Sequence, residues 1–184
     1  METTLNEGAT VTDVLMNEHE TIKDLFRRFD DASSDRQKKS IGDDGLRRID
    51  NHIILKEELF YPAVRRHVGE RQRVVQALAA LQVAKLLIKE LRGISGGEHY
   101  NARFNLLKEN ILQHFAEETS ELMPRIEKSE GDLAPIAERM IEMKSRAAAS
   151  RSMNVDGRTA AAVAAGAVAI GVAVWAFNRF RSEN

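Results

Sequence analysis

This chain carries one pattern twice, as His52-Ile-Ile-Leu-Lys-Glu-Glu-Leu-Phe-Tyr-Pro62 and as His114-Phe-Ala-Glu-Glu-Thr-Ser-Glu-Leu-Met-Pro124. Each segment begins with a histidine, continues through acidic residues and reaches a proline ten residues later. Residues four apart lie on the same face of a helix, one turn apart. His114 and Glu118 therefore point the same way, as two ligands of one metal ion must. At the matching place after His52 the residue is Lys56 and not a carboxylate, so the function depends on this mismatch.

Apolar residues recur at helical spacing around both segments and predict four helices, at residues 12–30, 46–66, 71–93 and 100–122. Residues 31–45 are rich in Ser, Asp and Gly and predict a loop, and Pro62 is expected to bend or break the second helix. A fifth helix is expected from Asp132, its cap, towards residue 148. Short loops favour an antiparallel up-and-down arrangement of the first four helices. The predicted fold class is all-α: a four-helix bundle, a fifth helix and a C-terminal transmembrane helix.

Composition excludes several classes of function. The 184 residues suit one domain with an appendage, with 30% charged and 43% apolar residues. A net charge of −1 provides no general attraction for nucleic acid. The lack of cysteine excludes disulfides, thiolate metal sites and cysteine nucleophiles. No glycine-rich phosphate loop or serine triad is recognisable, and no catalytic residue is predicted.

Residues 160–177 differ from the rest of the chain, because this stretch carries no charge. As a helix it would span about 27 Å at ~1.5 Å per residue, just enough for a bilayer core. Trp175 and Phe177 stand near its end, where an interfacial belt would lie. We predict a transmembrane helix, which small residues at four-residue spacing could pair into a homodimer. The alternative is a buried or oligomeric alanine-rich helix.

The chain accordingly divides into a bundle at 1–148, a basic linker at 149–159, the transmembrane helix at 160–177 and a basic tail at 178–184. The first ten residues are polar and have no apolar core, so a cleaved signal peptide is not expected. The predicted localisation is a membrane, with a single C-terminal anchor and the N-terminal domain in the cytoplasm.

Three histidines, His19, His52 and His114, lie on the inner stripes of three predicted helices, and Glu118 lies one turn from His114. Four buried polar side chains without partners would be costly. Either a metal ion satisfies them or they satisfy each other. Imidazole and carboxylate ligands without sulfur suit iron, manganese or zinc. The two remaining histidines are expected on the surface.

The chain resembles the hemerythrin-like family of HHE cation-binding domains over about residues 11–148. Asn17-Glu18-His19-Glu20 and the two repeated segments carry the resemblance. It implies an up-and-down four-helix bundle with a non-haem di-iron centre, in proteins that bind or sense oxygen, handle nitric oxide or peroxide, or store iron. It also implies that His19 and His52 are ligands from the first two helices, and that His114 and Glu118 are the pair from the fourth.

Two ligands expected from the resemblance are absent. Lys56 stands where a carboxylate is expected, and Leu81 stands where the third helix should provide a histidine. Losing one bridging carboxylate and one imidazole should cripple a di-iron site. The Lys56 ammonium could fill the cavity and pair with Glu118, or it could extend outward along the bundle. A third arrangement is one ferrous ion held by His19, His52 and Glu118, which Lys56 would disfavour electrostatically.

Three functions follow from these arrangements. The first is a membrane-anchored hemerythrin-like protein that binds non-haem iron, or another divalent metal, through an altered site, for sensing oxygen or nitric oxide, or for sensing or storing iron. The second is a metal-free scaffold or interaction domain at the membrane. The third is an iron-dependent oxidoreductase that removes peroxide, which the incomplete ligand set disfavours. Whether the protein is an enzyme stays open.

Overall fold

The computed structural model describes residues 8–129 and 132–148, and these residues form helices and short connections without any strand. The chain divides into two compact units, Met1–Met143 and Lys144–Asn184. The bundle, the candidate site and the surface pockets described below all belong to the first unit. The predicted all-α class is therefore confirmed for the described part of the chain.

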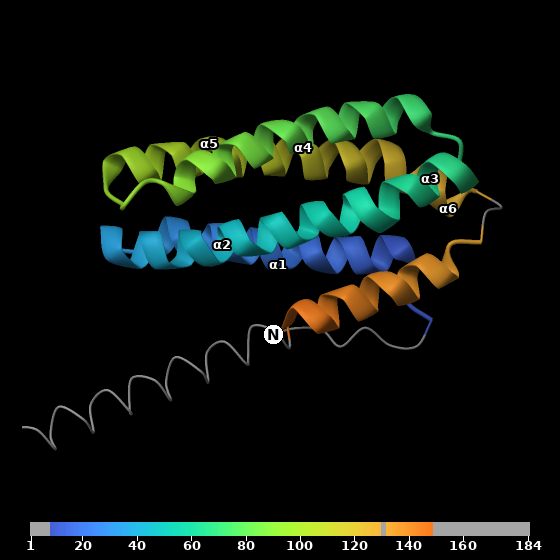
Figure 1. Cartoon of the computed structure of the whole chain (residues 1–184), viewed down its shortest axis with the longest axis horizontal. Coiled ribbons are helices and arrows are strands. Elements are labelled where there is room, and N and C mark those ends of the chain that lie inside the picture. Colours follow the sequence, from blue (N-terminus) through green and yellow to red (C-terminus); the bar gives the residue numbers. More distant parts are fainter. Residues whose placement is uncertain (1–7, 130–131, 149–184) are drawn as a thin grey trace, which may run out of the picture. The chain divides into compact units, whose positions relative to one another are not determined.

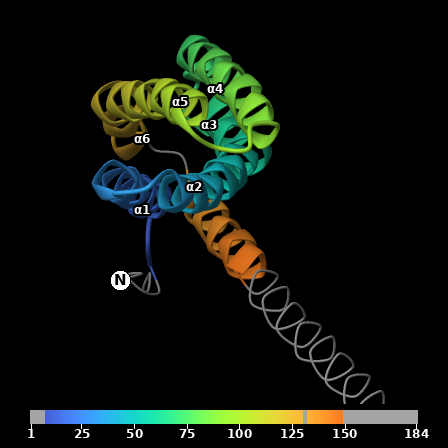
Figure 2. The ribbon, with the colours of Figure 1, turned by 90° about the vertical axis from the view of Figure 1, so that its left-hand side faces the viewer.

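The elements are α1 (Val11–Asp31), α2 (Asp35–Leu55), η1 (Lys56–Phe60), α3 (Tyr61–His67), α4 (Arg71–Arg92), α5 (Glu98–Glu117), η2 (Glu118–Leu122) and α6 (Met123–Glu127). Figure 1 shows α1 beside α2 and α4 beside α5, and the end-on view of Figure 2 shows these pairs as two layers. α3 continues the line of α2 through η1. The helices thus form the bundle that the sequence predicts.

α1 begins with a capping box. The Thr10 hydroxyl accepts a hydrogen bond from the backbone N–H of Asp13 at 3.1 Å, and the Asp13 carboxylate accepts one from the Thr10 N–H at 2.9 Å. Two backbone groups that the helix leaves unpaired are satisfied in this way. Hydrogen bonds from the Thr10 side chain and backbone lower the pKa of Asp13.

The predicted loop at residues 31–45 is wrong for most of its length, because α2 begins at Asp35. Ser34 caps this helix and accepts a hydrogen bond from the Gln37 N–H at 3.3 Å. The Lys39 ammonium bonds the Asp43 carboxylate one turn later at 2.7 Å. Helical spacing of charges therefore stabilises a segment whose Ser, Asp and Gly content is typical of loops.

The two glycines of that segment serve packing between helices. A Cβ atom on Gly42 would lie 2.9 Å from Cε1 of Tyr100, and one on Gly45 would lie 3.3 Å from Cζ of Phe104. Real Cβ atoms rarely approach so closely, so a side chain at either position would force the Tyr100 or Phe104 ring of α5 to shift. A contact between residues far apart in sequence accounts for these glycines.

Both prolines of the repeated segments are accommodated by a π-helical turn. The Tyr61 N–H bonds the Lys56 carbonyl, and the Met123 N–H bonds the Glu118 carbonyl, each five residues back. Proline has no N–H and clashes with the carbonyl four residues before it, and a wider turn relieves this conflict. Pro62 therefore does not end the helix, which continues through α3.

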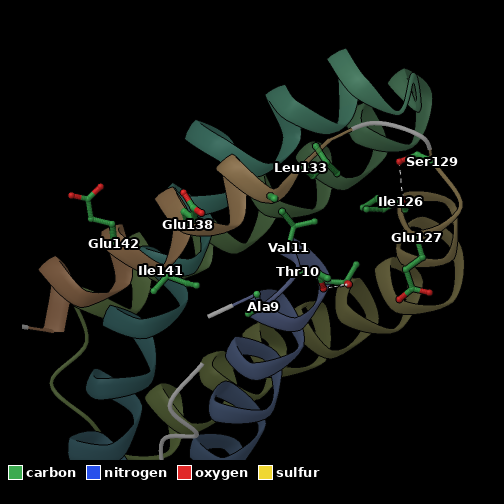
Figure 3. Close-up of a pocket in the computed structure, with 13 residues that line it drawn as sticks. Ala9, Thr10, Val11, Ile126, Glu127, Ser129, Leu133, Glu138, Ile141 and Glu142 are labelled. Carbon is green, nitrogen blue, oxygen red and sulfur yellow. Dashed lines mark hydrogen bonds between the residues drawn. The ribbon is translucent and has the colours of Figure 1, made fainter. Parts of the chain in front are cut away.

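Residues 134–148 form the expected further helix, and the Asp132 carboxylate accepts a hydrogen bond from the Ala134 N–H at 3.1 Å. A groove of about 760 Å³ runs between the start of α1, the end of α6 and this helix, as Figure 3 shows. Val11, Ile126 and Leu133 provide apolar walls, and none of the predicted metal ligands lines it.

Within residues 8–129 and 132–148, no helix is both long and apolar enough to span a membrane. The predicted transmembrane helix at 160–177, the linker at 149–159 and the tail at 178–184 lie outside the described residues.

We expect Thr10→Ala to lower the free energy of unfolding by about 1 kcal/mol, the usual value of a helix N-cap. The pKa of the Asp13 carboxyl should rise towards its ordinary value, because the bonds from Thr10 lower it. Because the pKa of Asp13 is lower in the folded than in the unfolded protein, its carboxylate stabilises the fold at pH values above the unfolded-state pKa. This stabilisation is lost as the pH falls through the folded-state pKa. Urea unfolding and an NMR titration of Asp13 measure both effects. Thr21→Ala, which removes a hydroxyl inside α1, is the control, and equal results for both variants would contradict the capping role.

Candidate metal centre

The four predicted metal ligands lie together inside the bundle, each at most 3% exposed. His19 comes from α1, His52 from α2, His114 from α5, and Glu118 is the first residue of η2. The Glu118 Oε2 atom lies 3.3 Å from His19 Nε2 and 3.9 Å from His114 Nε2, and the His19 and His52 ring centroids are 5.3 Å apart. Three helices and one π turn thus bring these side chains into one cluster.

Lys56 points into the same cluster and is fully buried. Its Nζ donates to Glu118 Oε2 at 2.7 Å and lies 2.6 Å from His114 Nε2. Of the two orientations that the sequence leaves open, the structure has the inward one. The ammonium group therefore pairs with the carboxylate, as a buried charge requires.

Tyr61 is a member of the cluster that the sequence reasoning missed. Its hydroxyl donates to Glu118 Oε1 at 3.0 Å and lies 3.4 Å from His114 Nε2, and its ring centroid is 5.2 Å from Lys56 Nζ. In an α-helix, Tyr61 would not share a face with Lys56, five residues earlier, but the π turn aligns the two. Burial and the Glu118 charge raise the pKa of Tyr61, so its hydroxyl stays a donor. Its place directly before Pro62 in the repeated segment was the available signal.

The charges of the cluster can be assigned from these contacts. Burial opposes the charge on Glu118, but the neighbouring Lys56 ammonium favours it, and the pKa of Glu118 lies well below its ordinary value. Burial and the Lys56 charge lower the pKa of His114 to about 3, so its imidazole is neutral near pH 7. Its Nε2 faces the protons of the Lys56 ammonium and must act as an acceptor, because the Tyr61 proton goes to Glu118. The pair is thus a carboxylate and an ammonium beside a neutral ring.

His19 and His52 differ from His114, because neither ring has a hydrogen bond. All four of their ring nitrogens are buried without a hydrogen-bond partner. The 3.3 Å approach of His19 Nε2 to Glu118 lacks the direction of a hydrogen bond. The His19 ring stacks on Phe115 with centroids 3.7 Å apart. Burial lowers the pKa of both histidines, so two neutral rings with unsatisfied nitrogens lie next to a carboxylate.

The residues present do not fit a di-iron centre. Leu81 is buried on the inner side of α4, where it offers no ligand atom. Glu57 turns to α4 and bonds Lys85 at 2.8 Å, and Glu58 is exposed, so neither replaces the carboxylate missing at Lys56. Among the described residues, no three His, Asp or Glu side chains are already arranged as ligands of one ion. Binding of any metal therefore requires some of these side chains to move.

An antiparallel helical bundle with inward histidines and a glutamate defines a class of metal-binding helical proteins. Residues 10–126 match the family model of the hemerythrin HHE cation binding domain, and the chain belongs to this family. A crystal structure of a hemerythrin HHE cation binding domain-containing protein from Mycobacterium kansasii is similar, with 22% identity and a TM-score of 0.63, covering 78% of this chain and 91% of that one. At this identity, the likeness concerns the fold. Comparison with curated proteins gives no match.

The family expected from the sequence is therefore confirmed, and it supports metal binding at a general level. The exposed positions of His67 and His99 agree with the surface placement expected for them. The roles of His19, His52, His114 and Glu118 as metal ligands stay predictions.

We expect Lys56→Met to destabilise the metal-free protein by about 3–5 kcal/mol, since it leaves the Glu118 charge buried and unpaired. The control is Lys85→Met, which breaks a lysine–glutamate pair at the surface and should cost at most about 1 kcal/mol. Urea unfolding in the presence of a chelator measures both. A double variant, Lys56→Met with Glu118→Gln, should regain part of the loss, and equal costs for the two single variants would contradict the assignment of a buried ion pair.

Proposed function

We propose that this hemerythrin-family domain binds one divalent metal ion, iron before others, through His19, His52 and Glu118, with the Lys56 ammonium in place of a second ion. One observation carries the proposal: the four ring nitrogens of the two histidines are buried without hydrogen bonds, beside a carboxylate. Unsatisfied buried polar atoms call for a partner. Two imidazoles and one carboxylate are a donor set that suits a ferrous ion.

His114, the fourth predicted ligand, has a different role in this proposal. Its Nε2 atom already faces Lys56 at 2.6 Å and Tyr61 at 3.4 Å. It reaches a metal ion only when the ammonium is removed. His114 therefore orients Lys56 in the wild-type chain and becomes a ligand in a chain where Lys56 is a carboxylate.

A ferrous ion with three protein ligands keeps open positions, at which a small molecule such as oxygen or nitric oxide can bind. This supports a role in sensing oxygen, nitric oxide or iron, or in storing iron. The incomplete ligand set disfavours the peroxide-removing oxidoreductase, since redox cycling usually needs the full set of ligands.

A second candidate is a metal-free bundle that serves as a scaffold or interaction domain. The specific observation in its favour is that Lys56, Tyr61, His114 and Glu118 satisfy one another through contacts of 2.6–3.4 Å. In this candidate the internal ammonium provides the positive charge that a metal ion would otherwise bring.

Iron analysis separates the two candidates. We expect the wild-type protein, loaded anaerobically with ferrous ion and desalted, to retain no more than one iron per chain. His52→Gln should abolish binding, because it removes one of three ligands. His67→Gln changes an exposed histidine and should leave the stoichiometry unchanged. In the double variant Lys56→Glu with Leu81→His, the stoichiometry should approach two iron ions per chain, because the variant supplies both of the absent ligands.

Two firmly held irons in the wild type would refute the proposed site, as would unchanged binding by His52→Gln. No iron in the wild type would refute the iron site and favour the metal-free candidate.

We further propose that residues 160–177 anchor the protein in a membrane, with the bundle in the cytoplasm. The uncharged sequence of this stretch supports the anchor. Full-length protein should be found in the membrane fraction, and a variant ending at residue 158 should be found in the soluble fraction. Carbonate-washed membranes, probed with an antibody against the bundle, provide the measurement. Recovery of both proteins in the soluble fraction would refute the anchor and favour the alanine-rich helix.

A further inference from the structure

A small pocket reaches the buried cluster from the surface between α4 and η2. It has a volume of about 40 Å³ and is lined by Arg73, Gln76, Ala77, His114, Glu117, Glu118, Glu121 and Leu122. A cavity of ~10–15 Å³ on this measure holds one water molecule, so the pocket has room for a few waters or one small ion. His114 and Glu118 are otherwise almost completely buried, at 2% and 3% exposed. The pocket therefore meets the cluster at these two side chains.

An ion pair joins the two walls of this pocket at its outer side. The Arg73 guanidinium on α4 pairs with the Glu121 carboxylate on η2. The two side chains are 29% and 52% exposed, so the pair lies in contact with solvent. Arg73 also approaches Glu70 at 3.7 Å. An exposed pair of this kind is weak and is broken and re-formed easily.

The charges of the residues that line the pocket favour the entry of cations. Three carboxyl groups line the pocket, and Lys56 neutralises that of Glu118, so Glu117 and Glu121 remain against the single positive charge of Arg73. When Arg73 turns away, a small acidic opening leads to the carboxylate that the ammonium holds. Such an opening attracts cations and repels anions.

We propose that this pocket is the route by which metal cations enter the cluster, and that the Arg73–Glu121 ion pair obstructs it. The identity of the ion rests on the proposed function, but the route itself does not. Arg73 is thus a positioning residue for access, and it touches neither the histidines nor the ion.

The first test needs no metal. Deuterium exchange at the imidazole C2 carbon, followed by mass spectrometry in the presence of a chelator, reports how solvent reaches each histidine. In Arg73→Gln, exchange at His114 should rise by up to about fivefold, which corresponds to the roughly 1 kcal/mol that an exposed ion pair is worth. His52, which does not line the pocket, should be unchanged.

Arg125→Gln is the matched control. Arg125 also pairs with Glu70, at 3.0 Å, but does not line the pocket. It should leave His114 exchange unchanged. Equal exchange at His114 in the wild type and in Arg73→Gln would overturn the route.

The second test uses ferrous ion alone. Transfer of bound iron to an external chelator should be about two- to fivefold faster from Arg73→Gln than from the wild type, with the same stoichiometry. An unchanged transfer rate would overturn the route for metal. If no form of the protein binds iron while His114 exchange still rises, the proposed function fails and the route to the cluster stands.

Discussion

The ion pair between Lys56 and Glu118 is the interaction on which the centre of this bundle depends. Both side chains are buried, and their contact of 2.7 Å joins η1, which continues α2, to η2, which continues α5. Taking two charges out of water is expensive, and the attraction compensates only when further hydrogen bonds complete the geometry. Tyr61 and His114 provide these bonds, the one by donating to Glu118 and the other by accepting from Lys56. The four side chains thus form one unit, in which the loss of a member leaves a buried group without a partner.

This unit also explains why an altered hemerythrin site can stay folded. In a di-iron centre, positive metal ions balance carboxylates. Here a covalently attached ammonium supplies a positive charge, and it cannot dissociate. The same charge limits what can bind. Two unit charges about 4 Å apart interact by roughly 4 kcal/mol at an effective dielectric constant of ~20, and a divalent ion doubles this repulsion. A metal ion is therefore best placed on the side of His19 and His52, with Glu118 between it and the ammonium.

The repeated segments fold in the same way despite their different chemistry. Each places a charged residue at the start of a π turn and a proline two residues after its end, and each turn closes through a bond to the carbonyl of that charged residue. The prolines thus fix the backbone from which Lys56 and Glu118 approach each other. A lysine and a glutamate at matching positions meet because the two segments run on neighbouring helices, which Figure 1 shows in opposite layers.

Much of this architecture is determined by the sequence itself. The helices at α1, α4 and α5 and the inward stripe that contains His114 and Glu118 are evident from residue spacing, because helical periodicity is a local property. The family was evident from the resemblance of the repeated segments. The helix at residues 35–45 was not evident from the sequence, since its glycines are explained by their packing against Tyr100 and Phe104. Tyr61 was missed because a π turn changes the face of the helix on which it lies. Only the tertiary structure decided that Lys56 points inward. Its partners are 58 and 62 residues away in the chain, and whether a buried ammonium is stable depends on the groups that the fold brings to it.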